Sequence, residues 1–265
     1  MSPLLHVALI QLDAQQDLPS NLHKALAFCR QAILEGAQFI ALPEMFNYRG
    51  PHYVGETIPG PSTQPFIDLA AQHHVWILAG SICEISPVSD RFYNSSALIG
   101  PKGVLAVYRK LHLFDAVVDE RSIQESRSFT PGATPIMAAV RDIPIGLSIC
   151  YDLRFPSLYT HYAKSGVELI AVPASFTATT GAAHWEVLLR ARAIETQCFV
   201  LAPNQVGLGT RNVKTFGNSM IVDPWGQVLA QGNDSDEGLI SATLDLAHLH
   251  EIRAKLPTHL HRREL

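Results

Sequence analysis

The sequence predicts a mixed α/β fold in which helices cover a system of sheets in layers. Strand-like and helix-like segments alternate in the first 80 residues and again from 145 to 202, and pairs of strands lie between and after these stretches. The chain has 265 residues, of which 47% are hydrophobic, enough for one large domain or two small ones. Because no linker or repeat divides it, we expect one domain over residues 1–265, with residues 257–265 as a polar, basic C-terminal tail.

The N-terminal segments indicate a β-α-β unit. Residues 5–12 are a strand candidate, and Leu18-Pro19-Ser20-Asn21 supplies a turn and a helix start. The helix ends at Gly36, and residues 38–42 form a buried strand that should run parallel to the first. The apolar stripe expected to face the sheet consists of Leu22, Ala25, Leu26, Cys29, Ile33 and Leu34.

The remaining segments follow the same two patterns. Residues 50–62 are rich in Gly and Pro and indicate a loop, and residues 110–131 form a long irregular stretch, which in a compact domain is commonly functional. Gly100-Pro101-Lys102-Gly103 and Asp223-Pro224-Trp225-Gly226 are turn signals. Further strands are expected at 75–82, 94–99, 104–108, 133–140, 143–149, 168–172, 198–202, 215–222, 228–231 and 238–243, and further helices at 63–74, 157–164, 182–197 and 244–255.

Composition argues against several classes of protein. The net charge of −4 without a clustered basic face argues against nucleic-acid binding. The start of the chain has no basic and apolar regions of a signal peptide, and no run approaches the 18 apolar residues of a membrane span. The twelve histidines are scattered and the cysteines show no zinc spacing, so no metal site is expected. Unpaired cysteines fit a reducing, cytoplasmic location. The cysteines are Cys29, Cys83, Cys150 and Cys198.

Cys150 lies where a buried strand should feed a helix through a sharp turn. Strand 143–149 ends at Cys150, and Phe155-Pro156 precedes helix 157–164. Such a turn places a side chain at the rim of a sheet, near the positive end of the helix, where the pKa of a thiol falls below its free value of about 8.5. This setting suits a nucleophile, although free cysteine is also one of the most commonly buried residue types.

Two charged residues occupy comparable strand ends. Glu44 follows strand 38–42 directly after Pro43, at the carboxyl end where open α/β sheets bind their ligands. Its apolar neighbours favour a general base over a solvated acid. Lys110 closes strand 104–108, where a lysine is otherwise most often a surface charge.

Together these three residues resemble the Glu-Lys-Cys triad of the carbon–nitrogen hydrolase, or nitrilase, superfamily. The matching motifs are Leu-Pro-Glu44-Met, Tyr-Arg-Lys110-Leu-His-Leu-Phe and Ile-Cys150-Tyr-Asp-Leu-Arg-Phe-Pro, and the resemblance covers nearly the whole chain. It implies a four-layer α-β-β-α sandwich, a homodimer or higher homo-oligomer, and no metal or organic cofactor.

The residues around the nucleophile distinguish branches of that superfamily. True nitrilases typically carry Cys-Trp-Glu, whereas Cys150-Tyr151-Asp152 is similar to the Nit amidase branch. Residues 180–198 and the tail motif His261-Arg262-Arg263 look most like the Nit1 type, which implies a deaminated glutathione amidase. In this branch a second glutamate lines the pocket, and Glu125 matches it. Alternatives are an omega-amidase acting on 2-oxoglutaramate or 2-oxosuccinamate, an aliphatic nitrilase, and a non-catalytic scaffold.

The resemblance also implies roles for individual residues. Cys150 would attack the side-chain amide of a 2-oxo acid amide and form a thioester. Glu44 would carry the proton, first from the thiol to the departing ammonia and then from water. The Lys110 ammonium and the backbone N–H of Tyr151 would hold the oxyanion.

Two further residues are candidates for substrate binding. Arg154 could clamp a substrate carboxylate or instead pair with Asp152 or another acid. His184 is expected to help shape the pocket, although its helix is equally a packing or dimer surface. An apolar stripe on that helix favours burial against a partner subunit. The stripe consists of Trp185, Leu188, Leu189 and Ala193.

Overall fold

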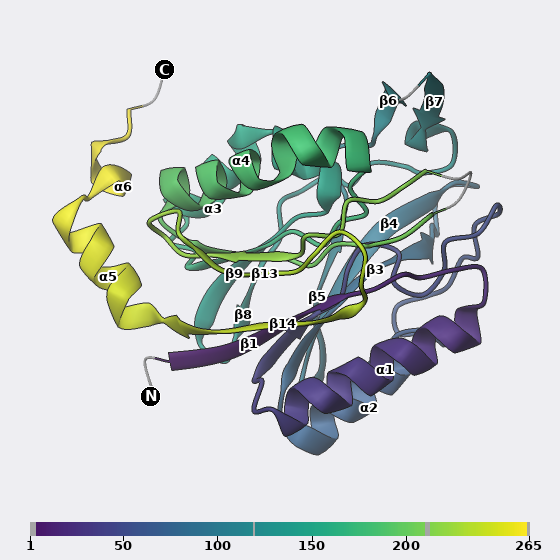
Figure 1. Cartoon of the computed structure of the whole chain (residues 1–265), viewed down its shortest axis with the longest axis horizontal. Helices are drawn as coiled ribbons and strands as arrows, with labels where there is room; N and C mark the ends of the chain where they lie inside the picture. The colour runs from purple at the N-terminus through teal and green to yellow at the C-terminus, as the bar shows by residue number, and fades with distance from the viewer. Residues whose placement is uncertain (1–3, 119, 210–212, 264–265) are drawn as a thin grey trace.

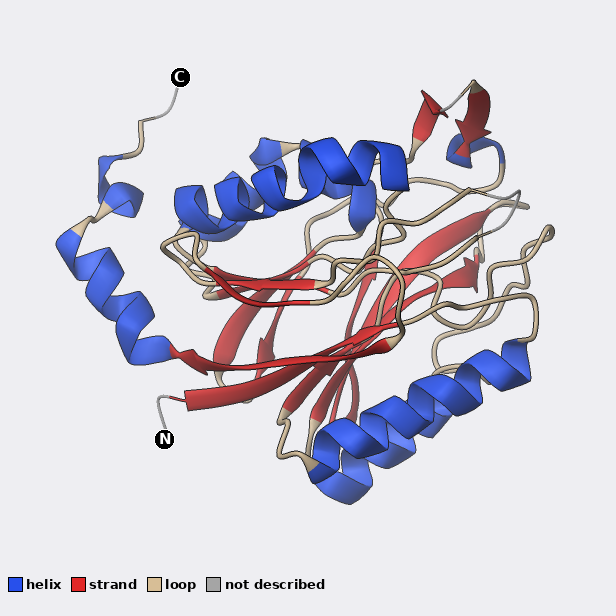
Figure 2. Cartoon of the chain, in the orientation of Figure 1, coloured by secondary structure: helices blue, strands red, loops and turns tan. Residues whose placement is uncertain are grey.

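A computed structural model of the protein describes residues 4–118, 120–209 and 213–263. Residues 1–3, which belong to the segment expected not to be a signal peptide, and residues 264–265 of the predicted tail lie outside the described residues. Two stacked sheets form the middle of the molecule, and helices cover both outer faces (Figures 1 and 2). The predicted α-β-β-α layering is therefore confirmed.

The two sheets are built on the same plan. In the described part of the chain each has six strands, and each contains three neighbouring parallel strands flanked by antiparallel ones. The first sheet has the order β14 (Gly238–Asp245), β1 (Leu4–Gln11), β2 (Phe39–Ala41), β3 (Trp76–Ile85), β4 (Phe92–Gly100) and β5 (Gly103–Arg109). The second has the order β13 (Val228–Gln231), β12 (Met220–Val222), β11 (Phe199–Ala202), β10 (Leu169–Ala171), β9 (Ile143–Leu147) and β8 (Met137–Val140).

The helices fall into two layers and one edge. Two cover the outer face of the first sheet, two cover the second, and the last two run beside the sheets near the C-terminus (Figure 1). The side chain of Asp17 caps the first helix by accepting a hydrogen bond from Ser20 N at 3.3 Å. The helices are α1 (Leu18–Leu34), α2 (Gln64–His73), α3 (Pro156–Lys164), α4 (Ala178–Thr196), α5 (Leu246–Lys255) and α6 (Thr258–His261).

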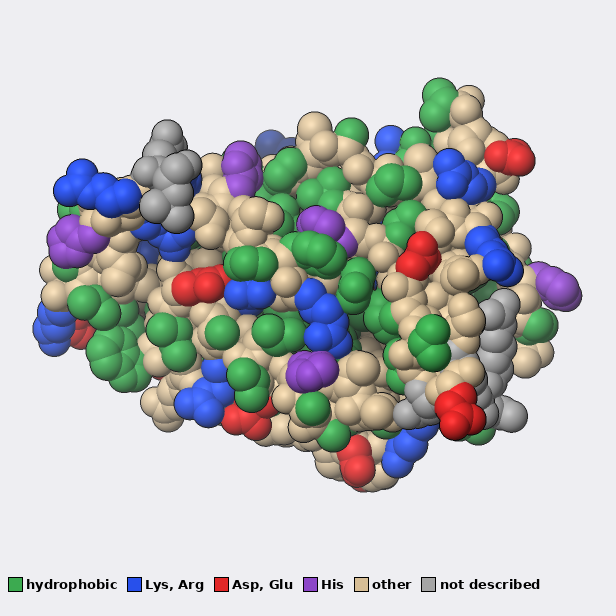
Figure 3. All heavy atoms as spheres, turned by 90° about the horizontal axis from the view of Figure 1, so that it is seen from above, with side chains coloured by type: hydrophobic (Ala, Val, Ile, Leu, Met, Phe, Trp, Pro, Cys, Tyr) green, Lys and Arg blue, Asp and Glu red, His purple; other side chains and the backbone are tan. Residues whose placement is uncertain are grey.

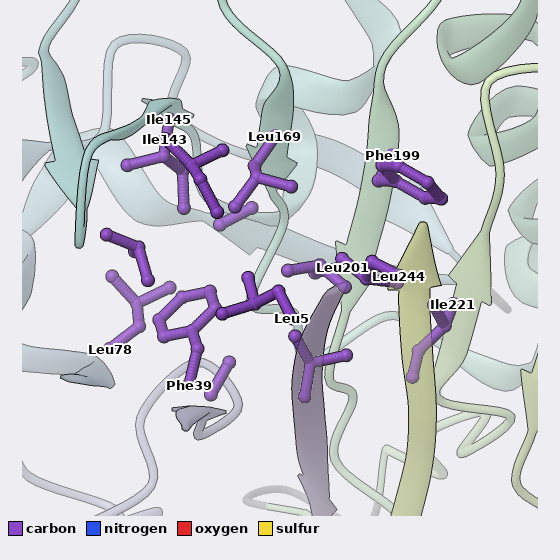
Figure 4. Close-up of a cluster of buried hydrophobic side chains, with 14 of the residues drawn as sticks. Leu5, Phe39, Leu78, Ile143, Ile145, Leu169, Phe199, Leu201, Ile221 and Leu244 are labelled. Carbon is purple, nitrogen blue, oxygen red and sulfur yellow. The ribbon is translucent and has the colours of Figure 1, made fainter. Parts of the chain in front are cut away.

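Three apolar layers hold the sandwich together, and alternation along the strands creates them. In β1, Leu5 and Leu9 face the second sheet, whereas Ala8 and Ile10 face α1 and α2. Figure 4 shows the layer between the sheets, where Leu5 and its neighbours meet side chains from the second sheet. Full burial of each such aliphatic side chain contributes about 1.5–3 kcal/mol. The parallel central strands are buried on both faces, as their continuous apolar sequence predicts.

The stretch from 110 to 131 is more regular than the sequence analysis predicted. It contains a hairpin of β6 (Asp115–Val118) and β7 (Arg121–Gln124), which stands apart from both sheets (Figure 1), followed by the 3₁₀ helix η1 (Glu125–Arg127). Each strand has only four residues, too few for either the strand or the helix period to stand out. The strand expected at 215–222 is confined to β12, and α4 begins four residues before the predicted start at 182.

Two predictions about apolar stripes need correction, one at a single residue of α1 and the other on α4. Leu34 was expected to face the sheet but is 88% exposed, whereas Ala32 is fully buried. At 100° per residue, Leu34 lies about 140° from Cys29 around α1, outside the buried face. On α4, Trp185, Leu189 and Ala193 are fully buried in the core of their own chain, with Leu188 packed against it, so the predicted burial against a partner is wrong.

Candidate active site

The three residues expected to form a triad come from strand ends that meet at one edge of the sandwich. Glu44 follows β2 and Lys110 follows β5, both in the first sheet, and Cys150 follows β9 in the second. Strand β5 is antiparallel to β4, and β4 is antiparallel to β3, so the carboxyl end of β5 lies at the same edge as those of the parallel strands. The fold thereby gathers residues more than a hundred positions apart in sequence.

Lys110 lies at the centre of a buried cluster of charges. Its Nζ is 2.9 Å from Glu44 Oε1, 3.1 Å from Glu125 Oε1 and 2.9 Å from Glu125 Oε2. Lys110 is only 3% exposed, and this burial acts to lower the pKa of its ammonium. The two carboxylates outweigh burial and raise that pKa well above its ordinary value, so the ammonium stays charged.

Glu125 reaches this cluster from the 3₁₀ helix η1, outside the main sheets. Its Oε2 accepts a hydrogen bond from Phe114 N at 2.7 Å, and its own backbone N–H donates to Phe114 O at 3.2 Å. This reciprocal pair ties η1 to the chain just after Lys110. The structure thus places the second glutamate directly against the lysine.

Cys150 occupies a strained turn between β9 and the 3₁₀ helix η2 (Cys150–Arg154). Its φ of +48° lies in the left-handed region, which is costly for a residue with a Cβ. Its backbone N–H donates to Pro173 O at 2.9 Å, just after β10. Cys150 is partly exposed, whereas Cys29, Cys83 and Cys198 are buried. Of the four cysteines, the one predicted as nucleophile is therefore the least buried residue.

Asp152 holds this turn in place from below. Its fully buried carboxylate accepts hydrogen bonds from Ile149 N at 2.9 Å and from the Tyr108 hydroxyl at 2.7 Å. The backbone N–H and ring Nδ1 of His112 lie 2.9 and 2.7 Å from the same carboxylate. Because Tyr108 belongs to β5 and Asp152 follows β9, this network joins the two sheets beneath the cysteine.

The thiol of Cys150 is less acidic than the sequence analysis predicted. Burial raises its pKa well above the ordinary value, and the charge of Glu44 and its hydrogen bond with the thiol add to the increase. Lys110 acts in the opposite direction but does not prevail. The expected lowering of the pKa by the following helix is thus wrong, because desolvation outweighs it. The resting cysteine is a neutral thiol that needs a base.

Sequence analysis missed three groups that hold Glu44 in position. Asn94 Nδ2 donates to Glu44 Oε1 at 2.8 Å and to Glu125 Oε1 at 3.0 Å. Ser175 N donates to Glu44 Oε2 at 2.8 Å, and Gln205 Nε2 donates to the Glu44 carbonyl at 2.9 Å. Counting pairs back from the turn at 100–103 would place Asn94 opposite Arg109. A register shift between Leu98 and Ile99 places it opposite Lys110 instead, so its position could not be predicted from the turn alone.

Arg154 and His184, both predicted to bind substrate, contact each other. Arg154 Nη1 lies 3.1 Å from His184 Nδ1, and its guanidinium lies 5.1 Å from the ring centroid of Phe176 and 5.9 Å from that of Tyr151. The alternative salt bridge of Arg154 to Asp152 is not formed, because other donors occupy that carboxylate. Arg154 ends the 3₁₀ helix that Cys150 begins, so it lies slightly more than one helical turn after the cysteine.

Across residues 4–118, 120–209 and 213–263, no three His, Cys, Asp or Glu side chains gather in a way that could bind a metal ion. None of the helices in these ranges combines the length and the hydropathy that crossing a bilayer demands.

Comparisons with known proteins agree with this geometry. The sequence profile of the family described as "Carbon-nitrogen hydrolase" matches residues 6–254. The human "Omega-amidase NIT2" is 37% identical over 257 residues, covering 95% of this chain and 92% of that protein. "Deaminated glutathione amidase" of Synechocystis sp. (strain PCC 6803 / GT-S) is 38% identical over 271 residues, covering 99% of both. The crystal structure of the C. elegans NitFhit protein matches with a TM-score of 0.90 and 32% identity, over 99% of this chain and 66% of that longer one.

Proposed function

This chain belongs to the carbon–nitrogen hydrolase family, and we propose that it is an amidase that converts deaminated glutathione, a 2-oxo acid amide, into the free acid and ammonia. The observation that carries this proposal is the contact of Lys110 with Glu44 beside Cys150, a partly exposed residue whose thiol both charges act on. That arrangement combines a nucleophile, a base and a positive charge, which are the groups that amide hydrolysis requires.

The first half of the reaction forms a thioester. The sulfur of Cys150 attacks the amide carbon while its proton passes to Glu44, since the raised thiol pKa prevents a resting thiolate. The negative charge that develops on the amide oxygen is held by Lys110 and by the backbone N–H of Tyr151 in the first turn of η2. Each such donor contributes roughly 3–4 kcal/mol in comparable sites. Glu44 then gives its proton to the nitrogen, the C–N bond breaks, and ammonia leaves.

The second half releases the acid. Glu44 takes a proton from water as the oxygen attacks the thioester carbon. The C–S bond then breaks, and Glu44 returns the proton to the sulfur to restore the thiol. Glu125 supports both halves. It presents two oxygens to Lys110 in the resting site, so one of these contacts can be exchanged for the oxyanion while the other keeps the pair together.

The substrate class follows from Arg154. A guanidinium placed between the rings of Tyr151 and Phe176 can form a bidentate pair with a carboxylate, the group that distinguishes 2-oxo acid amides from simple ones. The resting contact with His184 keeps the guanidinium oriented.

A second candidate is an omega-amidase acting on shorter 2-oxo amides, which the similarity to the human protein of that name favours. Ammonia release from deaminated glutathione, 2-oxoglutaramate and a simple aliphatic nitrile separates the possibilities. We expect kcat/KM to be highest for deaminated glutathione and negligible for the nitrile. A higher value for 2-oxoglutaramate would assign the chain to the second candidate, and no ammonia from either amide would refute an amidase of this class.

We also propose a homodimer formed through the outer face of the α3–α4 layer. Val187 and Ile194 are 67% and 51% exposed on α4, and Trp225, 64% exposed, belongs to a turn that contacts Ile194. Figure 3 shows this face, with hydrophobic side chains distributed among cationic ones. Sedimentation of wild type and of the Ile194→Lys variant tests the proposal. We expect a dimer that dissociates on substitution, and a monomeric wild type would contradict it.

A cytoplasmic location is supported by the state of the cysteines. All four are free, and Cys150 is accessible, so an oxidising compartment would threaten the proposed nucleophile. Cell fractionation tests this, and recovery in a secreted fraction would contradict it.

A further inference from the structure

We propose that Asn94 is the positioning residue of the site, and that its side-chain amide holds Glu44 and Glu125 together around Lys110. This inference rests on the proposed amidase function and assigns a role to a residue outside the expected triad. Asn94 lies near the start of β4 and is 1% exposed.

Asn94 contacts all three charged residues of the cluster. Its Nδ2 donates to Glu44 Oε1 at 2.8 Å and to Glu125 Oε1 at 3.0 Å, and its backbone carbonyl accepts from Lys110 N at 2.9 Å. The two glutamates come from separate segments, one after β2 and the other in η1. One amide group therefore sets the distance between carboxylates that the sequence places far apart.

The orientation of the amide is dictated by these carboxylates. Asn94 Oδ1 is buried without a hydrogen-bond partner among the described residues. Reversing the amide would place this oxygen against two carboxylate oxygens that cannot donate to it. A buried acceptor left unsatisfied is a destabilising feature that native structures rarely retain without a reason. Here the reason is that both amide hydrogens are needed by Glu44 and Glu125.

The charges of the cluster explain why a neutral donor is required. Two carboxylates face one ammonium, which leaves one formal negative charge in excess in a buried site. Hydrogen bonds donated to a carboxylate favour its charged form. Two other charged or titratable groups act on these residues. One is the Cys150 thiol, and the other is Arg49, which interacts with Glu44 through its charge alone. Asn94 adds stabilisation to both carboxylates without adding a second cation.

Two variants of Asn94 test this role, with Ser96→Ala as the matched control. Asn94→Leu removes both donors, and Asn94→Asp keeps the shape but adds a carboxyl group. Ser96 lies two residues along the same strand and is equally buried, and its hydroxyl has no partner among the described residues. The readouts are kcat, KM and the pH profile of ammonia release, together with the pH profile of Cys150 alkylation by iodoacetamide, which requires no amide turnover.

The two variants should respond to pH in opposite directions. We expect Asn94→Leu to lower kcat by about 10- to 100-fold, the range for losing a hydrogen bond to a charged group. The loss should be greatest at low pH, because the substitution removes hydrogen bonds of the kind that favour a charged carboxylate. Asn94→Asp should lose most at high pH, where a third carboxylate ionises beside the other two. KM should change by less than about twofold, since no substrate contact is removed.

The following results would overturn the role proposed for Asn94. A loss that is the same at every pH in both variants would mean that Asn94 only supports packing, and a similar pH shift in Ser96→Ala would also overturn the proposal. If Asn94→Leu does not fold, Asn94→Asp decides alone, since it preserves the volume of the side chain. If the wild type hydrolyses no 2-oxo amide, the proposed function fails, and the alkylation profiles still establish whether Asn94 acts on the cluster.

Discussion

The two halves of the site come from different sheets and solve different physical problems. The first sheet, with η1, supplies Glu44, Lys110 and Glu125, which are charged side chains held mainly by other side chains. The second sheet supplies Cys150, a neutral thiol placed by backbone contacts and a strained turn. In the proposed mechanism neither half is reactive alone, because the proposed base lies in one and the proposed nucleophile in the other. The proposed chemistry therefore depends on transfer of a proton between the sheets.

The contrast extends to how each half tolerates burial. Charges survive burial in the first half because each carboxylate receives several donors. In the second half, burial instead keeps the thiol protonated. The position of Cys150 is thus set by backbone geometry, and its reactivity is set by the opposite sheet.

The largest effect is expected when the thiol of Cys150, the proposed nucleophile, is removed. Cys150→Ala should reduce ammonia release on the order of 10⁶-fold, as in other enzymes that lose their nucleophile. The melting temperature should stay close to that of wild type, because the substitution removes a single sulfur atom from a residue that is only partly buried. Cys83→Ala is the matched control and should keep its activity. Turnover by Cys150→Ala at the wild-type rate would end the thioester mechanism.

Glu44 and Lys110 act on the pKa of the Cys150 thiol in opposite directions, and substitution of each residue separates the two effects. Glu44→Gln should lower kcat by roughly 10²–10⁴-fold, the range for a lost general base. It should also let Cys150 react with iodoacetamide at lower pH, because a negative charge that raises the thiol pKa is gone. Lys110→Met should move the alkylation profile to higher pH, because a charge that lowers that pKa is lost. Shifts of the same sign in both variants would contradict the assigned electrostatics.

A smaller effect is expected for Asp152, which joins the two sheets through Tyr108 and Ile149. Asp152→Asn should weaken the bonds that connect Tyr108 and Ile149, and should lower stability by about 1–3 kcal/mol. Since the turn then orients the thiol less well, kcat should fall by about 10- to 100-fold while KM changes little. Urea denaturation and steady-state kinetics provide the measurements. Tyr108→Phe, which removes a single donor, should show a milder form of both effects, and an unaltered kcat in Asp152→Asn would separate the junction from catalysis.

The smallest effect is expected for Arg154, where substitution should change substrate binding rather than the groups proposed to carry out the reaction. Arg154→Ala should raise KM for a carboxylate-bearing 2-oxo amide by about 10-fold or more, consistent with loss of a charge-assisted pair. KM for a neutral amide should hardly change, and His184→Ala should produce a weaker version of the same difference. Comparison of the two substrate classes is the test, and equal increases for both would exclude a carboxylate clamp.

Several features of the fold and site could be predicted from local pattern. The β-α-β units, the turn at 100–103 and the strand-end positions of Glu44, Lys110 and Cys150 are visible in the sequence because side-chain period and turn residues are local properties. The relative direction of the strands in these units can also be predicted, because a connection through a helix makes the two strands parallel. These local features do not predict that the end of β9, in the second sheet, meets the ends of β2 and β5 in the first, because the stacking of the sheets decides that.

Other features depended on which surfaces meet in three dimensions. The stripe of α4 has the same spacing whether it faces a sheet or a partner, and the stacking of the layers assigns it to the sheet. The acidity of Cys150 depends on how much water the surrounding segments exclude, which helix position alone does not indicate.

The sequence by itself determined which residues lie at the strand ends and what chemistry they can perform, because those are consequences of residue type and local period. Only the tertiary structure decided how the buried charges are satisfied. Asn94 contacts Glu44 across 50 positions of sequence, and Tyr108 contacts Asp152 across 44. Hydrogen bonds of this kind require a donor and an acceptor to arrive within about 3 Å of each other. Strand register and sheet stacking set that distance, and both are properties of the folded chain as a whole.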